Sequence, residues 1–459
     1  MTKVAVIGLD CLVPELVFEL WKDDLPNLKA LREQSVWGRL ESCIPPITVP
    51  AWSCMLTGRD PGELGFYGFR NRGDYNYEEL QFATSALIRE KRVWDILSER
   101  GLDVIALGVP QSYPPTPVRG SLVGCFLTPS IQSEYTYPPQ LKEEISGVVG
   151  EYLLDVMDFR TDDKQRIVDQ IYEMTNKRFK LAEHLLRTKP WDFFMMVEMG
   201  TDRMHHGFWG QHAPEHPKFE KGGPFEFTIR DYYRHVDRLV GGLVESFPAD
   251  THVVVASDHG AKTMFGGLCI NDWLIREGYL VLKERPNGVT PFKVDMVDWS
   301  KTRVWGAGGY YGRAFFNVQG REPAGIVPRS QYESLRYEIK EKIESLPNDK
   351  GQAMANRVFR PEDIYREVRN IPPDLIVYFD DLNWRSVGSV GFPDIYTFEN
   401  DTGPDEANHA QHGVFMLKRA NGTGALGERS GLHIEDVAPT ILSLFGVEPP
   451  DGMHGRVVG

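Results

Sequence analysis

Acidic and histidine side chains stand beside several short apolar runs of this sequence. They are Asp10, Asp202, His206, Asp258, His259 and, just before a further run, His409 or His412. Because parallel strands end at one shared edge of a sheet, we expect side chains that follow such strands to gather there. Carboxylate oxygens and imidazole nitrogens in about equal number suit zinc or manganese better than calcium or an iron–sulfur cluster. Six ligands divide into two sites of three, and paired metals are a common device for phosphoryl transfer.

Each of these residues has a simpler interpretation when it is taken alone. An aspartate after a strand is commonly a helix cap or a turn residue, and Asp258–Gly260 could form a plain turn. Asp202 and His206 have the i,i+4 spacing that places both side chains on one helix face, as in an ordinary surface pair. Several such coincidences at predicted strand ends favour the metal interpretation.

Thr48 lies between prolines in the stretch CIPPITVPAWSCML, just ahead of an apolar run. The stretch predicts a helix with Thr48 at its N-cap, since Pro50 is tolerated in a first turn. That position puts the hydroxyl at the positive end of the helix, where phosphate oxygens also bind. A threonine hydroxyl becomes a nucleophile when a base or a metal lowers its pKa. The alternative is that Thr48 is only a helix cap.

Predicted strands and helices alternate along the chain. The apolar runs expected as strands are 4–9, 103–109, 121–127, 192–199, 251–256, 375–379 and 414–417. Helical patterns cover 25–34, 93–100, 162–186, 227–247, 331–345 and 435–445. This alternation predicts an α/β fold with a central, mostly parallel sheet and helices on both of its faces.

Residues 261–357 differ in composition from the rest of the chain. They are rich in Gly, Tyr and Trp, as in VWGAGGYYGR, and they interrupt the alternation. We therefore expect an inserted cap subdomain at 261–357, with 1–260 and 358–459 forming the catalytic core. The aromatic residues of 305–313 and of the loop 66–75 would either contact a substrate or simply form the core of the cap.

Composition excludes several classes of protein. A net charge of −14 over 459 residues argues against binding of nucleic-acid polymers, which requires basic surface. Small phosphorylated substrates stay open, because bound metal ions reverse the local field. No apolar run has a transmembrane length, and the N-terminal run is too short for a secretion signal. Five scattered cysteines suit a reducing cytosol, so we expect a cytoplasmic protein without a membrane partner.

Motifs spread over nearly the whole chain resemble the alkaline phosphatase superfamily. They include VIGLD, TVPAWSCMLTGRDPGELGFYGF, TDRMHHGFW, VVVASDHG and HIEDVAPTILSLFGVEPPDGMHGRVV. Within that superfamily the sequence is most similar to the type I phosphodiesterase/nucleotide pyrophosphatase branch and its predicted cytoplasmic phosphohydrolase/phosphomutase group. The resemblance implies an alkaline phosphatase-like fold and two divalent metal ions, zinc or manganese.

The resemblance also implies which residues hold the metals. One metal would be held by Asp10, Thr48, Asp258 and His259, and the other by Asp202, His206 and His409. His409 is preferred to His412 because the family shows H-x-x-x-G before its last core strand, matched here by His409 and Gly413. Three further histidines are expected to be neighbours of the site or structural: His205, His433 and His454.

One departure from the family concerns Phe69. It stands where nucleotide pyrophosphatases carry an asparagine that supports the transferring phosphoryl group, so that activity is less expected here. Arg70 or Arg72 would supply the missing contact, since arginine matches phosphate geometry. Alternatively, both arginines are solvated residues of a Gly-rich loop. Phe69, Arg70 and Arg72 are thus the candidate substrate contacts.

The expected activity is that of a two-metal phosphohydrolase acting on phosphate diesters or monoesters. Thr48 would attack phosphorus in line and form a phosphothreonine that water then hydrolyses. The alternatives are a phosphomutase and a non-catalytic metal-binding protein of the same fold. A sulfatase is excluded, because Trp52 stands where the C/S-x-P-x-R motif of sulfatases requires arginine.

Overall fold

A ten-stranded sheet forms the centre of the computed structural model, which describes residues 2–77, 80–422 and 424–459. Its strands run in the order β20-β2-β19-β9-β1-β8-β5-β6-β7, with β21 beside β2. The middle strands are parallel: β9 (Thr251–Ala256), β1 (Lys3–Leu9), β8 (Phe193–Glu198), β5 (Val104–Leu107) and β6 (Gly120–Val123). They are buried almost throughout, which explains their continuous apolar sequences.

Antiparallel strands flank this parallel centre. β19 (His412–Lys418) runs antiparallel to both β9 and β2 (Val36–Glu41), and β7 (Thr136–Tyr137) runs antiparallel to β6. Two short strands, β20 (Gly427–Glu428) and β21 (Leu432–His433), extend the edge at β2. The sheet is therefore mixed, and parallel at its centre as the sequence predicts.

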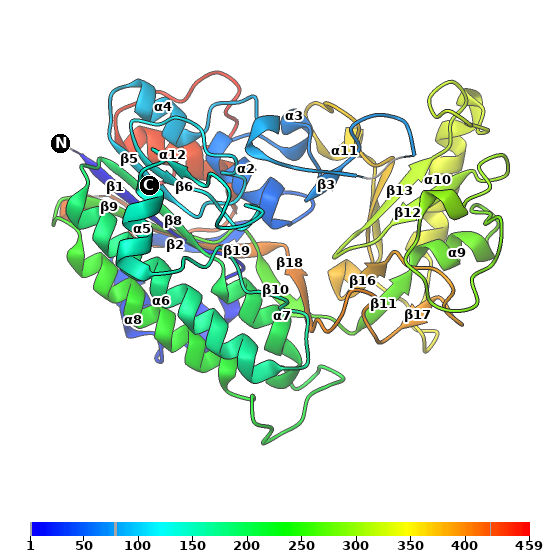
Figure 1. Ribbon diagram of the computed structural model, residues 1–459, viewed down its shortest axis with the longest axis horizontal. Coiled ribbons are helices and arrows are strands. Elements are labelled where there is room, and N and C mark those ends of the chain that lie inside the picture. Colours follow the sequence, from blue (N-terminus) through cyan, green and yellow to red (C-terminus); the bar gives the residue numbers. More distant parts are fainter. Residues whose placement is uncertain (1, 78–79, 423) are drawn as a thin grey trace.

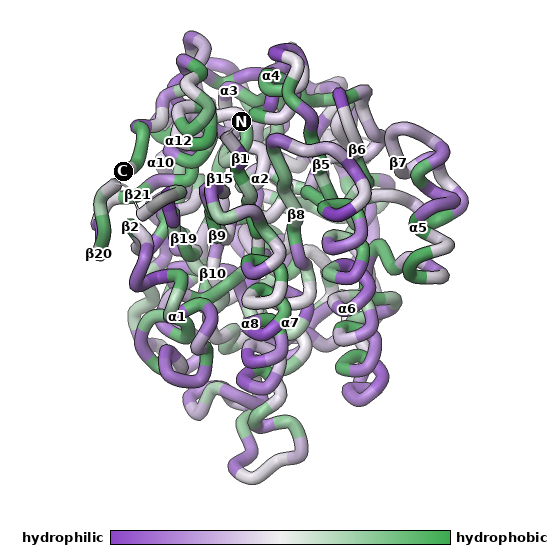
Figure 2. Tube along the Cα trace, turned by 90° about the vertical axis from the view of Figure 1, so that its left-hand side faces the viewer, coloured by the Kyte–Doolittle hydropathy of each residue, from purple (hydrophilic) through white to green (hydrophobic). Residues whose placement is uncertain are grey.

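Helices cover both faces of the sheet, as Figure 1 shows. One face carries α1 (Pro26–Glu33), α5 (Leu141–Val149), α6 (Lys164–Thr188), α7 (Gly200–His212) and α8 (Thr228–Ser246), and the other carries α2 (Thr48–Thr57), α4 (Val93–Glu99) and α12 (Val437–Leu444). In α8, the buried residues Ile229, Val236 and Val240 recur at helical spacing, which gives the helix one apolar face. Figure 2 shows hydrophilic and hydrophobic turns alternating along α6 and α8. The predicted α/β fold is confirmed.

A smaller lobe lies beside the sheet, on the right in Figure 1, and has an apolar core of its own. One of its sheets runs in the order β12 (Val304–Ala307), β13 (Gly312–Phe316), β15 (Leu375–Tyr378) and β14 (Arg357–Phe359). The other runs in the order β16 (Trp384–Val387), β11 (Gly266–Cys269) and β17 (Tyr396–Thr397), and α9 (Ile270–Arg276) and α10 (Tyr332–Glu344) pack beside them.

The smaller lobe also takes up residues beyond the predicted insertion. The run 375–379 forms a strand, as expected, but its β15 pairs with β13 and β14 and not with the central sheet. The apolar cluster of the lobe extends from Leu268 to Ile395, and so draws on both sides of position 357. An apolar run predicts a buried strand without indicating which sheet will take it, because strand partners are chosen by long-range contacts.

Two connections join the lobes near the carboxyl edge of the central sheet. β10 (Gly260–Thr263) follows β9 and pairs antiparallel with β18 (Ala407–Ala410), which leads into β19. The chain after α2 forms a second connection through α3 (Pro61–Leu64), β3 (Arg70–Asn71) and β4 (Gln81–Phe82), near α11 (Pro361–Ile364).

Within the described residues, no helix is both long and apolar enough to cross a membrane. The five cysteines are all free and buried.

Gly8 in β1 has no room for a side chain. A Cβ atom there would lie 2.6 Å from Cη2 of Trp52 on α2 and 2.9 Å from the carbonyl oxygen of Met196. We expect Gly8→Ala to lower the free energy of unfolding by about 1–3 kcal/mol in urea titrations, because overpacking forces neighbouring atoms to shift.

The control for this prediction is Gly242→Ala in α8. Gly242 is exposed, and a Cβ atom there would meet no atom within 4 Å. Its replacement should leave stability unchanged or raise it, because alanine is the better helix former. An equal loss of stability in both variants would show that close packing at Gly8 is not the cause.

Candidate active site

Three aspartates and a histidine meet at the carboxyl edge of adjacent strands. Asp10 follows β1, Asp258 and His259 follow β9, and Asp202 lies in the first turn of α7 after β8. The strands β9, β1 and β8 are neighbours in register, so their ends lie side by side. His409 arrives from β18, which pairs with β10.

The predicted residues form two groups. Asp10, Asp258 and His259 make one group, and Asp202, His206 and His409 make the other. Within each group the nearest ligand atoms all lie within 4.8 Å of one another, and every residue is buried. His412 belongs to neither group, because it is exposed on β19 opposite Glu41.

The three histidines are held in one orientation by hydrogen bonds at Nδ1. His409 Nδ1 lies 2.7 Å from the carbonyl oxygen of Pro46, and His259 Nδ1 lies 3.1 Å from that of Gly260. His206 Nδ1 lies 2.8 Å from Asp405 Oδ1. Because each Nδ1–H donates to an oxygen, each Nε2 presents a lone pair to the aspartates, the arrangement that metal-binding histidines adopt.

The aspartates each keep one buried oxygen without a hydrogen-bond partner among the described residues: Asp10 Oδ1, Asp202 Oδ1 and Asp258 Oδ2. The other oxygen of Asp10 accepts from the Trp52 indole N–H at 2.6 Å, and that of Asp202 accepts from the Arg203 guanidinium. The other oxygen of Asp258 accepts from the backbone N–H of Cys11 at 3.2 Å. Burial and the nearby charge of Asp202 raise the pKa of Asp10, and burial and Asp10 raise the pKa of Asp258. Despite burial, His206 and Arg203 lower the pKa of Asp202. Buried carboxylates such as Asp10 and Asp258 are stabilised by protonation or by a cation, and the oxygen and nitrogen donors of the two groups fit divalent zinc or manganese.

Thr48 lies beside the first group. It is the first residue of α2, and Ile47 is the N-cap, one residue earlier than the sequence suggested. No side chain caps this helix, so the expectation that Thr48 is its N-cap was wrong. The reason is that Ile47 already has the extended backbone of a cap residue, with φ of −120°. The Thr48 hydroxyl instead lies 3.3 Å from His259 Nε2.

Two further residues complete the site: Asp405, which the sequence did not indicate, and Tyr310, which belongs to the aromatic stretch 305–313. Asp405 is buried and bonds His206, and its second oxygen accepts from the Tyr310 hydroxyl at 3.1 Å and from Arg160 at 3.2 Å. The Tyr310 ring stacks on His206 and His409, at centroid distances of 4.7 and 4.5 Å. No periodic pattern marks Asp405, and its only signal is its closeness in sequence to His409; Tyr310 lies between β12 and β13 in the aromatic stretch, but nothing in the sequence places it at the histidines.

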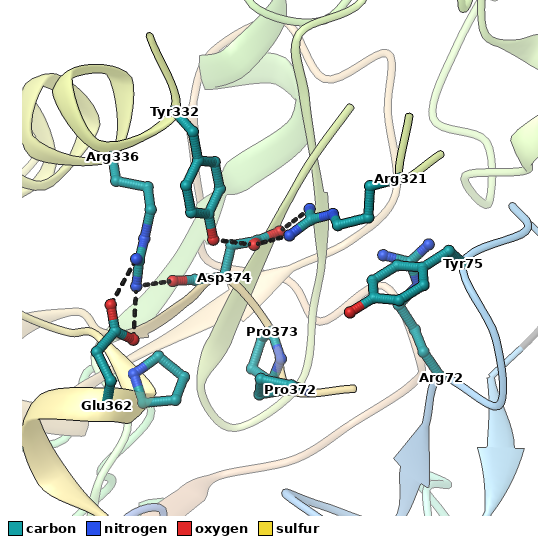
Figure 3. Close-up of a pocket in the computed structure, with 10 residues that line it drawn as sticks. Arg72, Tyr75, Arg321, Tyr332, Arg336, Glu362, Pro372, Pro373 and Asp374 are labelled. Atoms are coloured by element: carbon teal, nitrogen blue, oxygen red, sulfur yellow. Dashed lines mark hydrogen bonds and ion pairs between the residues drawn. The ribbon is translucent and has the colours of Figure 1, made fainter. Parts of the chain in front are cut away.

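The candidate substrate contacts have varied surroundings. Phe69 packs its ring against Phe126 at 6.0 Å, and Arg70 is exposed over the ring of Phe82. Arg72 is buried and pairs with Glu322 of the smaller lobe at 3.0 Å. It lines a small polar pocket of about 80 Å³ in that lobe, together with Tyr75, Arg321 and Arg336 (Figure 3).

The three histidines expected to be neighbours of the site or structural, His205, His433 and His454, have partners outside the two groups. His205 points to the Tyr233 hydroxyl at 2.9 Å, and burial lowers its pKa to about 3. His454 lies 2.9 Å from Glu63, and His433 Nδ1 accepts from the backbone of Glu435.

Comparisons with known proteins agree with this architecture. A family model described as type I phosphodiesterase/nucleotide pyrophosphatase matches residues 4–409. Phosphonoacetate hydrolase from Sinorhizobium meliloti 1021, solved with phosphonoformate, is similar with a TM-score of 0.60 and 16% identity, over 95% of this chain and 94% of that one. An inactive threonine-to-alanine variant of murine ectonucleotide pyrophosphatase/phosphodiesterase 5, solved with AMP, is similar with a TM-score of 0.56 and 12% identity, over 99% and 98%.

Human ectonucleotide pyrophosphatase/phosphodiesterase 5 is similar to the same degree, with a TM-score of 0.56 and 12% identity over 99% of this chain and 97% of that one. No match was found among curated proteins. At these identities the likeness to solved structures demonstrates the fold, which is that of alkaline phosphatase-like α/β proteins.

Asp405 should control how tightly the second group binds a metal. Asp405→Asn removes the carboxylate that accepts the Nδ1 proton of His206 and so orients its Nε2. Loss of such a partner typically weakens metal affinity by about 10–100-fold, and competition with a chromogenic chelator measures this for zinc. Asp363→Asn, at a half-exposed residue paired with Arg360, is the control and should leave zinc affinity unchanged. Unchanged affinity in Asp405→Asn would mean that Asp405 does not support a metal site.

Proposed function

The chain belongs to the type I phosphodiesterase/nucleotide pyrophosphatase family and is a phosphoric ester hydrolase, and from that premise we propose that it is a two-metal phosphohydrolase with Thr48 as its nucleophile. The observation that carries this proposal is the position of the Thr48 hydroxyl, at the start of α2 and 3.3 Å from His259 Nε2, beside two groups of buried carboxylates and imidazoles.

The two groups are the proposed metal sites. Asp10, Asp258 and His259 would hold one ion with Thr48, and Asp202, His206 and His409 would hold the other. The unpartnered carboxylate oxygens and the aligned Nε2 atoms support this assignment. Zinc fits the mixed donors best, and manganese is the alternative. When bound, such ions supply Lewis acidity, which lowers the pKa of a hydroxyl and neutralises charge on phosphoryl oxygens.

Thr48 would act as follows. Its hydroxyl loses its proton to water and Oγ1 attacks phosphorus in line; the bond from phosphorus to the leaving oxygen breaks, the leaving oxygen takes up a proton from water, and a phosphothreonine forms. Water then attacks that phosphorus from the opposite side and restores the hydroxyl. The start of α2 places positive backbone dipoles next to the phosphoryl oxygens. The inactivity of the threonine-to-alanine variant of murine ectonucleotide pyrophosphatase/phosphodiesterase 5 is consistent with a threonine nucleophile in this fold.

Substrate contacts are proposed at the loop after α3. Of the two arginines, Arg70 is the better candidate, because the guanidinium of Arg72 is already engaged by Glu322 and by the carbonyl oxygen of Asn76. Phe69 would line the same side of the site, since its partner Phe126 also lies under the Arg203 guanidinium that bonds Asp202. A cytoplasmic small-molecule phosphate ester is the proposed substrate class, with a phosphomutase and a non-catalytic metal protein as the alternatives.

Thr48→Ala should abolish multiple turnover while each metal group keeps its ion. The measurement is hydrolysis of aryl phosphate monoester, aryl diester and aryl phosphonate monoester by metal-reconstituted protein, with metal content from elemental analysis. Wild-type preference within this panel would define the reaction class. Thr57→Ala, which removes a buried hydroxyl bonded to Ser53 in the same helix, should retain turnover. Wild-type turnover in Thr48→Ala would rule out Thr48 as the nucleophile.

The proposed arrangement of two separate metal sites predicts the number of zinc ions that each variant binds. Asp258→Asn and Asp202→Asn each damage one group and leave the other intact, so each variant should retain about one equivalent of zinc where the wild type holds two. Elemental analysis after dialysis measures the stoichiometry. Two equivalents in both variants, or a single equivalent in the wild type, would contradict the two-site arrangement.

A further inference from the structure

We propose that Arg385 binds an anionic group of the substrate, a carboxylate or phosphate away from the reacting phosphorus, in a cavity beside the candidate active site. The inference rests on the proposed function, because it takes the ligand to be part of the molecule that the Thr48 site processes. It adds a specificity-determining residue in the smaller lobe to the machinery of the larger one.

The cavity lies between the two lobes and has a volume of about 150 Å³. Its wall includes Lys218, Phe265, Arg385, Glu399, Asn400 and Asp405. Asp405 also belongs to the site already described, since it bonds His206. The cavity and the candidate active site therefore share a wall. Its volume suits a carboxylate or a phosphate group and is too small for a whole nucleotide, because pockets for larger ligands typically exceed about 300 Å³.

Arg385 is a buried cation with unused donors. It lies in β16 opposite Gly267, and only 5% of its surface is exposed. Its Nε and Nη1 have no hydrogen-bond partner among the described residues, and the nearest carboxylate oxygen, Asp401 Oδ1, is 3.7 Å from Nη2. Asn400 Nδ2, also in the cavity wall, is likewise buried and unpartnered within the described chain. Buried donors of this kind normally have partners, so both point to a ligand.

Acidic neighbours do not occupy these donors. Both oxygens of Asp405 are already engaged, by His206, by Arg160 and by Tyr310. Glu399 is largely exposed and lies 3.9 Å from Lys218. Burial lowers the pKa of Arg385, and the charges of Asp405 and Asp401 only partly offset this effect.

In the arginine-rich pocket of the smaller lobe, by contrast, the arginines are already bonded to carboxylates. In Figure 3, Arg321 and Tyr332 both bond Asp374, and Arg336 bonds Glu362. Arg72, on the other side of that pocket, pairs with Glu322. Every one of these guanidinium groups has a carboxylate of the chain itself. Arg385 is different, because its nearest carboxylate, Asp401, lies beyond hydrogen-bond distance, with Oδ1 3.7 Å from Nη2, while its fork of N–H donors matches a planar carboxylate or a phosphate.

Arg385 is also within reach of the reacting region. Its Cζ lies 6.0 Å from the ring of Tyr310, and the same ring stacks on His206 and His409. One aromatic ring thus separates the guanidinium from the histidines of the second group. A substrate with its phosphoryl group at those histidines would place an anionic group a few bonds away near Arg385.

Binding calorimetry with non-hydrolysed phosphonates tests the inference. The probes are 3-phosphonopropionate and 4-phosphonobutyrate, each compared with the alkylphosphonate of the same length, on zinc-reconstituted protein. In the wild type, at least one carboxylated probe should bind about tenfold or more tightly than its partner, as expected for a charge-assisted hydrogen bond. Arg385→Gln should abolish that advantage without changing the affinity for the alkylphosphonates, and Arg385→Lys should retain part of it.

Three controls separate the possible outcomes. Arg276→Gln, which removes a half-exposed arginine of α9, should keep the advantage. Asp401→Asn should keep or increase it, because the neighbouring carboxylate competes with the ligand. If Arg385→Gln and Asp401→Asn lower the melting temperature equally and leave every affinity unchanged, then Arg385 only pairs with Asp401. That result would overturn the inference. If no phosphonate binds the wild type, the proposed function fails together with the inference; if alkyl and carboxylated probes bind equally, the inference alone fails.

Sulfate distinguishes a site for free anions. Titration of metal-free protein with sodium sulfate should give no binding that depends on Arg385, because the proposed subsite is filled by a group tethered through the phosphonate. Sulfate binding that is lost in Arg385→Gln, without a carboxylate advantage among the phosphonates, would assign the cavity to a free anion and overturn the inference.

Discussion

Three buried aspartates at one edge of a sheet are the constraint on which the rest of this structure depends. Asp10, Asp202 and Asp258 each keep a buried oxygen without a hydrogen-bond partner in the described chain, and burial raises the pKa of Asp10 and of Asp258. Folding brings them together because β9, β1 and β8 are adjacent and end at the same edge. Such a cluster raises the energy of the fold unless protons or cations compensate its charge, and its donor atoms are those that the proposed divalent metals would use.

The neighbours of the aspartates are oriented by groups from distant parts of the chain. Pro46, Gly260 and Asp405 each accept the Nδ1 proton of one histidine and so turn its Nε2 toward the carboxylates. Trp52, from the buried helix α2, bonds Asp10, and the same helix begins with Thr48. The position of the proposed nucleophile and the orientation of a proposed ligand therefore depend on one rigid element, which is the kind of preorganisation that phosphoryl transfer uses.

The two lobes differ in what they contribute. The larger lobe supplies the carboxylates, the histidines and Thr48, all on or beside the central sheet. The smaller lobe supplies Tyr310, which stacks on two of the histidines, and Arg385, a buried cation whose Nε and Nη1 have no hydrogen-bond partner among the described residues. This division fits a protein in which the chemistry is held by the sheet and the choice of substrate by the second lobe, since loops on a rigid scaffold vary more freely than strands.

The sequence by itself determined the α/β fold and the residue types at the strand ends, because an apolar run followed by Asp, or by Asp and His, is a local pattern. It also singled out Thr48 through its prolines. Tertiary structure alone decided the partners: that 375–379 joins the smaller lobe, that Arg72 pairs with Glu322 250 positions away, and that Asp405 and Tyr310 complete the site. These contacts join residues that are far apart in the chain. No local pattern indicates them, and only the packing of whole elements determines which side chains and strands meet.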